Sequence, residues 1–585
     1  METETKKKFD LKRILNFNVL AIILIVIFCI AISPVTLQND TYYTIKIGEH
    51  ITNYGLDMKD PFSWHENLDY TYPHWLYDIL TYKIYSIGGF TAIYAVTTIL
   101  ACILGIIIYF TNCKLSKNKI VAFLVTIGSM YLLEGFIAAR AQLVTFIIFI
   151  IEILLIEKFL QKKRIGYALG LIILPILIAN LHCAVWPFYF VLFLPYIAEY
   201  IIAVLADTII YKKLVRFRLK NDIKKLSRKP GKEDIVKSLT EKLNKLDEKV
   251  EKIKKVREED KKNPYKIYIN RNDNVKYLII IMIICAFTGL LTPLGDTPYT
   301  YLIKTMQGNT TKNISEHLPM TLTSQVPVLS TIIIFLGILT FTKTKIKLSD
   351  LFMLGGLCYL MLSSRRQLSL FALICAPILT KLAINTIYEY DYYEKISGWF
   401  KKRIVSIIGI LLLIALVGGL SYKYAKNKPN QSIVDESTYP VQACDYILNN
   451  IDLKTAKFYN EYNYGSYMLF RGIPVFIDSR ADLYAPEFSG LKDDIFSDFL
   501  NISGIGEFYE DVFEKYGITH VICYRNSKLN LIIIKTHDSN YKEIYVDNNF
   551  IIYERLSAKN VEENKEILET KEVKKLNSIQ EEENK

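Results

Sequence analysis

The stretch NFNVLAIILIVIFCIAISPVTLQNDTYY, residues 16–43, decides the fold. Up to Leu37 nearly every residue is apolar, and a run of this length is long enough to cross a bilayer as a helix. Asp40 follows directly, and an acidic residue where a helix leaves the membrane is uncommon. We therefore interpret the loop of residues 38–90 as part of a functional site at the membrane surface. The alternative is an ordinary solvated loop whose Trp and Tyr residues anchor the chain at the interface.

Apolar spans of this kind recur along the chain. Of its 585 residues 51% are hydrophobic, yet it carries 71 Lys and Arg and 59 Asp and Glu, so apolar spans alternate with charged segments. Hydropathy predicts about eleven membrane spans. Their predicted centres are Ile25, Ala101, Val125, Phe149, Ile173, Phe193, Ile281, Phe335, Met353, Leu373 and Leu412. We expect a polytopic α-helical membrane protein whose first span, with no small-residue cleavage site after it, is an anchor and not a removed signal peptide.

Basic residues predict the orientation of these spans. Lys6-Lys7-Lys8 and Lys12-Arg13 precede the first span, which places the N-terminus in the cytoplasm. An odd number of spans then puts the other basic loops inside, and puts residues 38–90 and the chain after Tyr424 outside. We expect a multi-pass protein of the cell membrane with a cytoplasmic N-terminus and an extracytoplasmic C-terminal domain.

One loop, residues 208–276, accounts for the net charge. Its Lys and Arg exceed its Asp and Glu by 12, which equals the net charge of the whole chain. We interpret it as a cytoplasmic segment near anionic membrane lipids, and nothing in it indicates nucleic-acid binding. Apolar residues recur in it at alternating spacings of three and four, namely Val236, Leu239, Leu243, Leu246, Val250 and Ile253. This heptad pattern predicts a short coiled coil or a helical hairpin.

Cysteines and short motifs exclude other classes of protein. Of the nine Cys, only Cys444 and Cys523 lie in the expected external domain, and the sequence leaves open whether they pair. The motifs CxxC, HExxH, GxGxxG and GxxxxGK[ST] do not occur. A soluble nucleotide-dependent enzyme therefore has no local support.

After a transmembrane domain of residues 1–425, residues 426–556 have the pattern of a small domain. Short apolar runs of the strand type occur at residues 457–459, 474–478, 520–524 and 550–553. Helical patterns, such as residues 505–516, lie between them. We expect a compact external α/β domain, followed by a charged tail, residues 557–585, that is either a solvated helix or disordered.

Three arginines lie on the expected outer side, against the usual charge bias. Arg140 is at a span junction, and Arg365 and Arg366 are in a short turn between two spans. They either meet lipid headgroups or bind phosphate groups, which the planar guanidinium suits. His182 and His317 are at the same level of the membrane, and each alone is more often a hydrogen-bonded interfacial residue than a catalyst.

Several motifs give the chain a resemblance to a known family. They are Asp40-Thr41-Tyr42-Tyr43, Gly48, Asp60-Pro61-Phe62-Ser63, His74-Trp75-Leu76, Arg140-Ala141-Gln142, Asn180-Leu181-His182, Arg365-Arg366-Gln367 and residues 460–467 and 475–484. With its long first external loop and C-terminal external domain, the chain resembles the GT-C class of membrane glycosyltransferases, and more closely a group of bacterial polytopic membrane proteins described as glycosyltransferases. Tyr464-Gly465 distantly resembles the acceptor motif of oligosaccharyltransferase catalytic subunits. Asn463 stands where that motif has Asp, so peptide recognition is not implied.

The resemblance implies a sugar donor carried on a polyprenyl phosphate and an acceptor, a glycan, lipid or protein, on the outer face of the membrane. Asp40 is the expected catalytic carboxylate, acting as a general base or as a ligand of a divalent metal such as Mg²⁺ or Mn²⁺. Asp60 and Glu316 are the next candidates. The expected substrate-binding residues are Trp64, His74, Trp75, Arg140, His182, His317, Arg365 and Arg366.

Two alternatives stay open. Asp478 and Asp482, beside Arg480, form either a hydrogen-bonded turn or contacts to the acceptor. The whole chain is either an enzyme or a non-enzymatic transporter, flippase or scaffold that handles lipid-linked saccharides in envelope assembly. Transporters usually keep ionisable groups near the membrane midplane, where Glu152 is the clearest example here. Acids and arginines gather at the outer boundary instead, which favours an enzyme.

Overall fold

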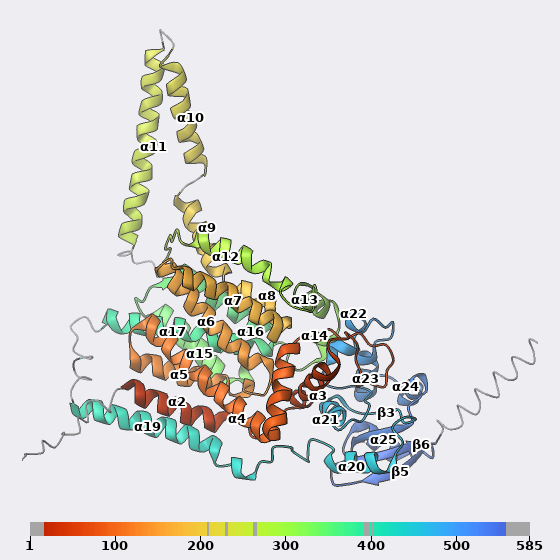
Figure 1. Ribbon diagram of the computed structural model, residues 1–585. Helices are drawn as coiled ribbons and strands as arrows, with labels where there is room; N and C mark the ends of the chain where they lie inside the picture. Colours follow the sequence, from red (N-terminus) through yellow and green to blue (C-terminus); the bar gives the residue numbers. More distant parts are fainter. Residues whose placement is uncertain are drawn as a thin grey trace, which may run out of the picture.

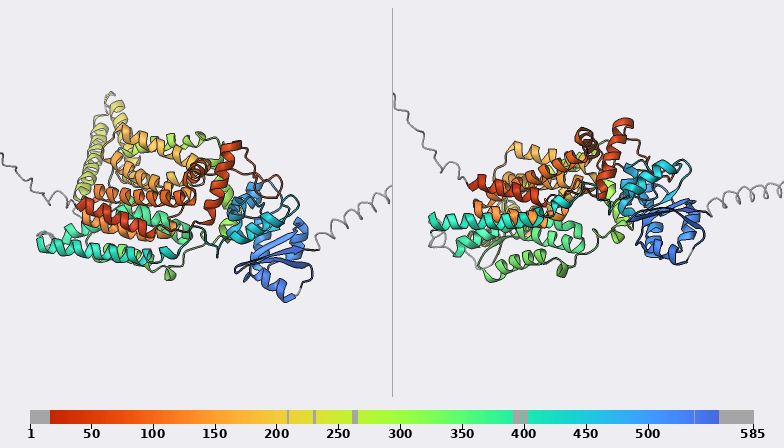
Figure 2. Two further views of the ribbon diagram at one scale, coloured as in Figure 1. Left: turned by 60° about the horizontal axis from the view of Figure 1, so that its bottom comes forward. Right: turned by 90° about the horizontal axis from the view of Figure 1, so that it is seen from below.

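The computed structural model describes residues 17–207, 210–228, 232–260, 266–390, 398, 403–536 and 538–556. They form a bundle of apolar helices with an α/β domain at one end and a long helical hairpin toward the other (Figures 1 and 2). The basic N-terminal segment and residues 557–585 lie outside the described residues, so the expectations for them stay predictions.

The helices of the bundle run side by side (Figure 2). They are α2 (Phe17–Ile32), α4 (Trp75–Ser116), α5 (Lys119–Leu132), α6 (Ala141–Gln161), α7 (Ile165–Leu181), α8 (Trp186–Val191), α9 (Leu194–Asp207), α12 (Val275–Ala286), α15 (Val326–Phe341), α16 (Leu348–Ser363), α17 (Leu368–Tyr390) and α19 (Arg403–Ala425). The predicted span centres lie on these helices, except that Phe193 falls between α8 and α9. Short strands β1 (Ile267–Tyr268) and β2 (Ile346–Lys347) pair in parallel beside them.

The outside of this bundle is as apolar as its inside. In α2, Ile25 and Phe28 are fully buried, whereas Ile23 and Ile27 are exposed. A helix that is hydrophobic all round fits a lipid environment. By length and composition, four of the described helices are able to cross a membrane, and six apolar helices of 10–17 residues accompany them. These helices indicate a membrane protein, and the count of about eleven spans stays a prediction.

The basic loop forms a helical hairpin of α10 (Ile210–Leu226) and α11 (Glu233–Asp260), which projects from the bundle (Figure 1). Its heptad residues Val236, Leu239 and Leu243 are half-buried, while their polar neighbours are exposed. An ion pair of 3.0 Å between Nε of Arg216 and Oδ1 of Asp247 joins the two helices. The apolar stripe is therefore used within the hairpin, and a coiled coil stays a prediction.

Much of the expected first external loop is helical. Asp40 lies in the first turn of α3 (Asn39–Tyr54), which packs against the first part of α4. The two helices meet at Gly48, where an added Cβ would lie 2.1 Å from the carbonyl oxygen of Asp78. Helix α4 then kinks at Gly88 and Gly89, and Gly89 has a positive φ of 60°. Glycine at these positions allows α3 to lie tightly across the end of the bundle.

The α/β domain contains a four-stranded sheet of order β3-β4-β6-β5. Its strands are β3 (Phe458–Tyr459), β4 (His520–Tyr524), β5 (Tyr541–Val546) and β6 (Phe550–Arg555), and its helices are α20 (Val441–Asn450), α21 (Tyr462–Phe470), α22 (Pro486–Ser489), α23 (Ile495–Gly504), α24 (Tyr509–Tyr516) and α25 (Lys528–Thr536). Strands β3 and β4 are parallel, and the other pairs are antiparallel. Cys444 and Cys523 are buried and free.

Two details of this domain correct the sequence prediction. Residues 474–478 are not a strand of the sheet, because Val475 makes only an isolated bridge to Ser63. Their apolar side chains are instead buried where the segment between α3 and α4 meets the domain. Strand β5 was not predicted, since Lys542 and Glu543 are exposed in it and weaken its apolar signal.

A buried guanidinium joins the segment after α3 to the α/β domain. Nη1 of Arg480 lies 2.7 Å from Oδ1 of Asp60, and Nη2 lies 2.7 Å from Oδ2 of Asp478. The side chains of both aspartates are fully buried. Beside this triad, Oγ of Ser63 donates to the Val475 carbonyl at 2.9 Å, and Nε1 of Trp64 donates to the Phe458 carbonyl at 3.0 Å. These ion pairs and hydrogen bonds hold the segment between α3 and α4 against the α/β domain.

We expect Arg480→Met to lower the free energy of unfolding by about 3–5 kcal/mol, because it leaves two carboxylates buried without their cation. The matched control is Arg471→Met in the same domain, since Arg471 pairs with an aspartate, Asp445, that is 56% exposed. That control should cost no more than about 1 kcal/mol. Denaturant unfolding in detergent, followed by tryptophan fluorescence, measures both. Equal losses in the two variants would contradict a structural role for the triad.

Candidate active site

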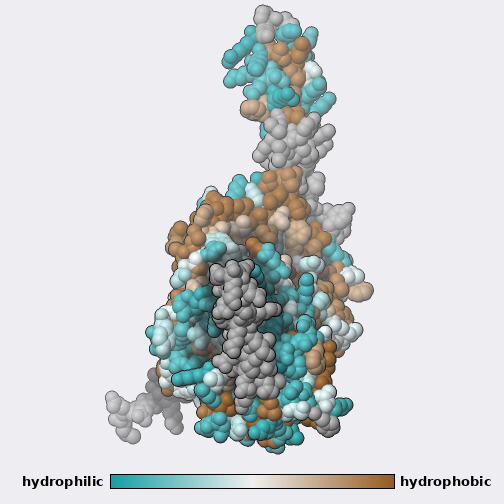
Figure 3. Space-filling model, turned by 90° about the vertical axis from the view of Figure 1, so that its right-hand side faces the viewer, coloured by the Kyte–Doolittle hydropathy of each residue, from teal (hydrophilic) through white to brown (hydrophobic). Residues whose placement is uncertain are grey.

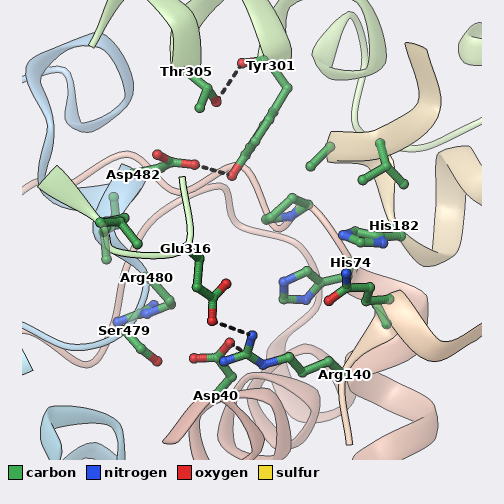
Figure 4. A pocket seen from close by; sticks show the side chains of 18 of the residues that line it. Asp40, His74, Arg140, His182, Tyr301, Thr305, Glu316, Ser479, Arg480 and Asp482 are labelled. Atoms are coloured by element: carbon green, nitrogen blue, oxygen red, sulfur yellow. Dashed lines mark hydrogen bonds and ion pairs between the residues drawn. The ribbon is translucent and has the colours of Figure 1, made fainter. Parts of the chain in front are cut away.

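A cavity of about 470 Å³ lies between the end of the bundle and the α/β domain. Its walls come from α3, from the segment before α4, from the junctions before α6 and after α7, and from the α/β domain (Figure 4). Figure 3 looks onto this end of the molecule, where hydrophilic surface predominates on the domain and hydrophobic surface gathers between the domain and the hairpin. The residues that line the cavity come from both the helical bundle and the α/β domain.

Arg140 lies between two carboxylates in this cavity. Its Nε is 2.9 Å from Oδ2 of Asp40, and its Nη1 is 3.3 Å from Oε1 of Glu316. Three segments that are distant in sequence therefore meet at one guanidinium. Burial lowers the pKa of Arg140, but the two carboxylates raise it above its ordinary value. Burial raises the pKa of Glu316, whereas Arg140 and Arg366 lower it, and the net effect is a decrease.

His74 forms a hydrogen-bonded pair with Asp78 at the start of α4. The Nδ1 atom of His74 lies 2.8 Å and 3.0 Å from the two carboxylate oxygens of Asp78, whose side chain is fully buried. The ring of His74 stacks on Tyr43, and His182 approaches it edge-on with 6.4 Å between ring centroids. His74, His182 and Tyr43 all line the cavity.

The predicted phosphate-binding arginines lie at an adjoining cavity of about 220 Å³. Arg140, Arg365 and Arg366 all line it, and Arg140 and Arg366 also line the main cavity. The loop at Glu316 holds the turn in place, because the backbone N–H of Arg366 donates to the Glu316 carbonyl at 2.9 Å. On its other side, Arg365 borders a third cavity of about 470 Å³, whose mixed walls include Phe136, Met320 and Val328 as well as Glu134 and Gln325.

The α/β domain supplies the wall opposite the arginines. Asp482 accepts hydrogen bonds from Oη of Tyr301 at 2.7 Å and from Oγ1 of Thr310 at 3.0 Å. Tyr301 and Thr310 belong to α13 (Thr297–Gln307) and α14 (Thr310–Asn313). Ser479 and Asn463 line the same wall. This side of the cavity therefore presents hydroxyl, amide and carboxylate groups.

The structure brings together most of the site residues that were predicted from the sequence. Those that line the main cavity are Asp40, His74, Arg140, His182, Glu316, His317 and Arg366. Arg365 lines only the neighbouring cavities. Asp60, Trp64 and Trp75 do not line the main cavity, because the segment that contains Asp60 and Trp64 is turned onto the α/β domain. Other aromatic residues line the main cavity in their place, among them Tyr70, Tyr301 and Phe488.

Sequence reasoning missed Asp78 and Tyr301. Asp78 follows His74 by four residues on one helix, and that spacing was a usable signal, because residues four apart share a helix face. Tyr301 lies in a segment with no feature that separates it from an ordinary loop, so no signal was available. Asp478, by contrast, belongs to the buried Arg480 triad, as the turn interpretation expected.

The sequence predicts a divalent metal at Asp40. Within the described residues, no group of three or more His, Cys, Asp or Glu side chains is placed to hold a metal ion. Asp40 instead faces the Arg140 guanidinium. We assign no step to a metal ion, and a requirement for Mg²⁺ or Mn²⁺ stays a prediction.

No protein-family model matches the chain, and no curated protein sequence matches it. Its structure is similar to the archaeal oligosaccharyltransferase AglB from Archaeoglobus fulgidus, solved in complex with an inhibitory peptide and a dolichol-phosphate. The TM-score is 0.50 at 12% sequence identity, and the match covers 94% of this chain and 75% of that chain. The Archaeoglobus fulgidus oligosaccharyltransferase tethered with an acceptor peptide containing the NVT sequon gives a TM-score of 0.52 at 12% identity, over 92% and 74% of the two chains.

These likenesses show the fold. The chain is similar in fold to the archaeal oligosaccharyltransferase over most of its length. The distant resemblance to oligosaccharyltransferase catalytic subunits that was expected from the sequence is confirmed at this level. A sequence identity of 12% is too low to assign a substrate to this chain.

Proposed function

We propose that this chain is a membrane glycosyltransferase that transfers a sugar from a polyprenyl-phosphate donor to an acceptor on the outer face of the membrane. The observation that carries the proposal is the Asp40–Arg140–Glu316 ion-pair cluster in a cavity between an apolar bundle and a polar domain. The fold supports it, since the similar archaeal enzyme was solved with a dolichol-phosphate and an inhibitory peptide.

The donor fits the row of three cavities. The cavity beside Arg365, whose lining includes Phe136, Met320 and Val328, takes the prenyl chain, and the arginines take the phosphate. Arg366 borders both the phosphate cavity and the main cavity, so the sugar projects from the phosphate toward Asp40. As the bond between sugar and phosphate breaks, negative charge grows on the phosphate, and fixed guanidinium groups stabilise it.

Asp40 is the catalytic carboxylate in this proposal. Its negative charge stabilises the positive charge that develops at the anomeric carbon during transfer. Arg140 holds it in position, and Glu316 holds Arg140 from the other side. The acceptor enters between this cluster and the wall that contains Asp482 and Asn463.

Transport of a lipid-linked saccharide is the alternative function. It is favoured by Glu152, which is fully buried within α6 and whose two carboxylate oxygens have no hydrogen-bond partner in the described part of the chain. Ionisable groups within spans are typical of transport pathways. The two functions differ in product, because transfer cleaves the bond between sugar and phosphate and transport leaves it intact. Incubation of reconstituted vesicles with labelled polyprenyl-phosphate hexose separates them, and translocation without cleavage would reject the enzyme.

Asp40→Asn should reduce transfer at least about a hundredfold, because it keeps the size of the side chain but removes the charge that stabilises the developing positive charge. The assay follows release of polyprenyl phosphate from a panel of synthetic polyprenyl-phosphate hexoses by the full chain in lipid nanodiscs. Asp445→Asn is the control, since Asp445 also pairs with an arginine but lies outside the cavity. Near-normal turnover of Asp40→Asn would end its assignment and leave Glu316 as the next carboxylate.

Arg366→Gln should weaken binding of farnesyl phosphate about tenfold or more, because a hydrogen bond to a charged group contributes about 1.5–3 kcal/mol. Farnesol, which lacks the phosphate, should bind the variant and the parent protein equally. Titration calorimetry in detergent measures both ligands, and Arg471→Gln serves as the control. An unchanged affinity for farnesyl phosphate would reject Arg366 as a phosphate ligand.

We propose the orientation that the basic loops predict, with the hairpin in the cytoplasm and the α/β domain outside. Lys245 in the hairpin and Glu543 in β5 are both exposed and suit introduced cysteines. A membrane-impermeant maleimide should label Glu543→Cys in intact cells, and label Lys245→Cys only after permeabilisation. The parent protein gives the background from the native cysteines. The opposite labelling pattern would overturn the orientation.

A further inference from the structure

We infer that His74, positioned by Asp78, is the general base of the transfer and that the acceptor group it serves is a carbohydrate hydroxyl. This inference rests on the proposed function. Oδ2 of Asp40 faces the Arg140 guanidinium, and the proposed function uses the charge of Asp40 at the anomeric carbon, so a second residue is needed to take the proton of the acceptor. His74 and His182 both line the cavity, but the Nδ1 atom of His74 faces the carboxylate of Asp78, whereas that of His182 faces the hydroxyl of Thr145. Only a carboxylate partner stabilises the imidazolium that forms when the ring takes a proton, so we assign the base to His74.

Asp78 fixes the ring of His74. Both of its carboxylate oxygens lie within 3.0 Å of Nδ1, so this nitrogen is held as the hydrogen-bond donor and the other, Nε2, carries the lone pair. The backbone N–H of Asp78 also donates to the His74 carbonyl at 3.0 Å. The carbonyl oxygen of Asp78 lies against Gly48 of α3, where no Cβ fits. The backbone and the side chain therefore hold the pair together in one orientation.

The second nitrogen of His74 faces the cavity (Figure 4). Its contact is the hydroxyl of Tyr43 at 3.4 Å, which is longer than an ordinary hydrogen bond. An acceptor hydroxyl that enters the cavity therefore has room to displace this weak contact. The ring of Tyr43 stacks on His74 and keeps the imidazole from rotating away.

The sugar transfer takes place in one step. Nε2 of His74 takes the proton from the acceptor hydroxyl as the hydroxyl oxygen bonds to the anomeric carbon. The bond from that carbon to the phosphate oxygen breaks, and its electron pair stays on the phosphate beside Arg366. Asp78 stabilises the imidazolium that forms, and the proton later leaves to solvent. We assign a hydroxyl acceptor because the facing wall contains Asn463 and Ser479, whose amide and hydroxyl groups suit sugar hydroxyls.

The charges around His74 set its response to pH. Asp78 on α4 faces Nδ1, Asp40 and Tyr43 face the ring from α3, Arg366 faces it from the turn before α17, and His182 approaches from the end of α7. Burial lowers the pKa of His74, but the charge and hydrogen bond of Asp78 outweigh it, so the pKa lies above its ordinary value. The neutral imidazole is the base, so kcat/KM should rise as the pH rises through this raised pKa.

The test uses the full chain in lipid nanodiscs with the panel of polyprenyl-phosphate hexoses and methyl glycosides as acceptors. His74→Ala should lose about a hundredfold or more in rate, and added imidazole should restore part of it, because the removed ring leaves space in the cavity. His50→Ala is the matched control. His50 also pairs with an aspartate, with 3.1 Å between its Nε2 and Oδ2 of Asp57, but it does not line the cavity. That control should keep its rate and show no response to imidazole.

Asp78→Asn tests the positioning residue without changing its shape. The acid limb of the pH profile should move to lower pH, because the amide no longer raises the pKa of His74. A purely structural role would lower the rate and leave the limb in place. The inference would be overturned if the acid limb of the pH profile of Asp78→Asn stayed where it is in the wild-type protein. A near-normal rate of the His74→Ala protein would also overturn it. Mass spectrometry of the product should show an O-linked sugar, and an N-linked product would overturn the acceptor class.

The outcomes separate this inference from the proposed function. Release of polyprenyl phosphate by the wild-type protein supports the proposed function whatever His74 does. If the wild type cleaves the donor and His74→Ala cleaves it equally well, only the assignment of the base is wrong. If the wild type cleaves no donor of the panel, the proposed function and this inference fall together.

Discussion

The guanidinium of Arg480, shared by Asp60 and Asp478, is the contact on which the functional end of the molecule depends. It joins the segment between α3 and α4 to the α/β domain where both carboxylates are fully buried. A buried charge is tolerated only when it is paired, so each of the three groups constrains the other two. Both the segment and the domain contribute walls to the main cavity. This contact therefore sets how far apart those walls lie.

The charged groups divide into two sets with different surroundings. The Arg480 triad is almost fully buried, although Arg480 also borders the main cavity, whereas Arg140 lies in that cavity between Asp40 and Glu316 with 26% of its side chain exposed. Next to Arg140, the cavity beside Arg365 adds apolar residues such as Met320 and Val328 to the polar groups around the arginines. A lipid-linked sugar has the same two halves, a prenyl chain that partitions into the bilayer and a sugar that needs hydrogen bonds. The arrangement suits chemistry at the boundary between them.

The sequence identified most of the cavity because polar residues at the ends of apolar spans are uncommon and conspicuous. Arg140, His182 and Arg366 were found in this way, and all three line the cavity. The same reasoning failed for Asp60 and Trp64. Their residue types suit a sugar site, but their side chains face the α/β domain, and only the contacts with Arg480 and Phe458 decide that direction. Residues 474–478 failed for a related reason, since apolar side chains can be buried at an interface as well as in a sheet.

The sequence by itself determined the apolar helices, the separate C-terminal domain and the small set of polar residues from which the site is built. Local composition suffices for these features, because hydrophobic length and periodicity depend on neighbours in the chain. The tertiary structure alone decided which carboxylate faces which cation. Arg140 and Glu316 are 176 residues apart, and Arg480 and Asp60 are 420 apart. The packing of the segments decides which of these distant residues pair. Residue type alone does not predict that packing.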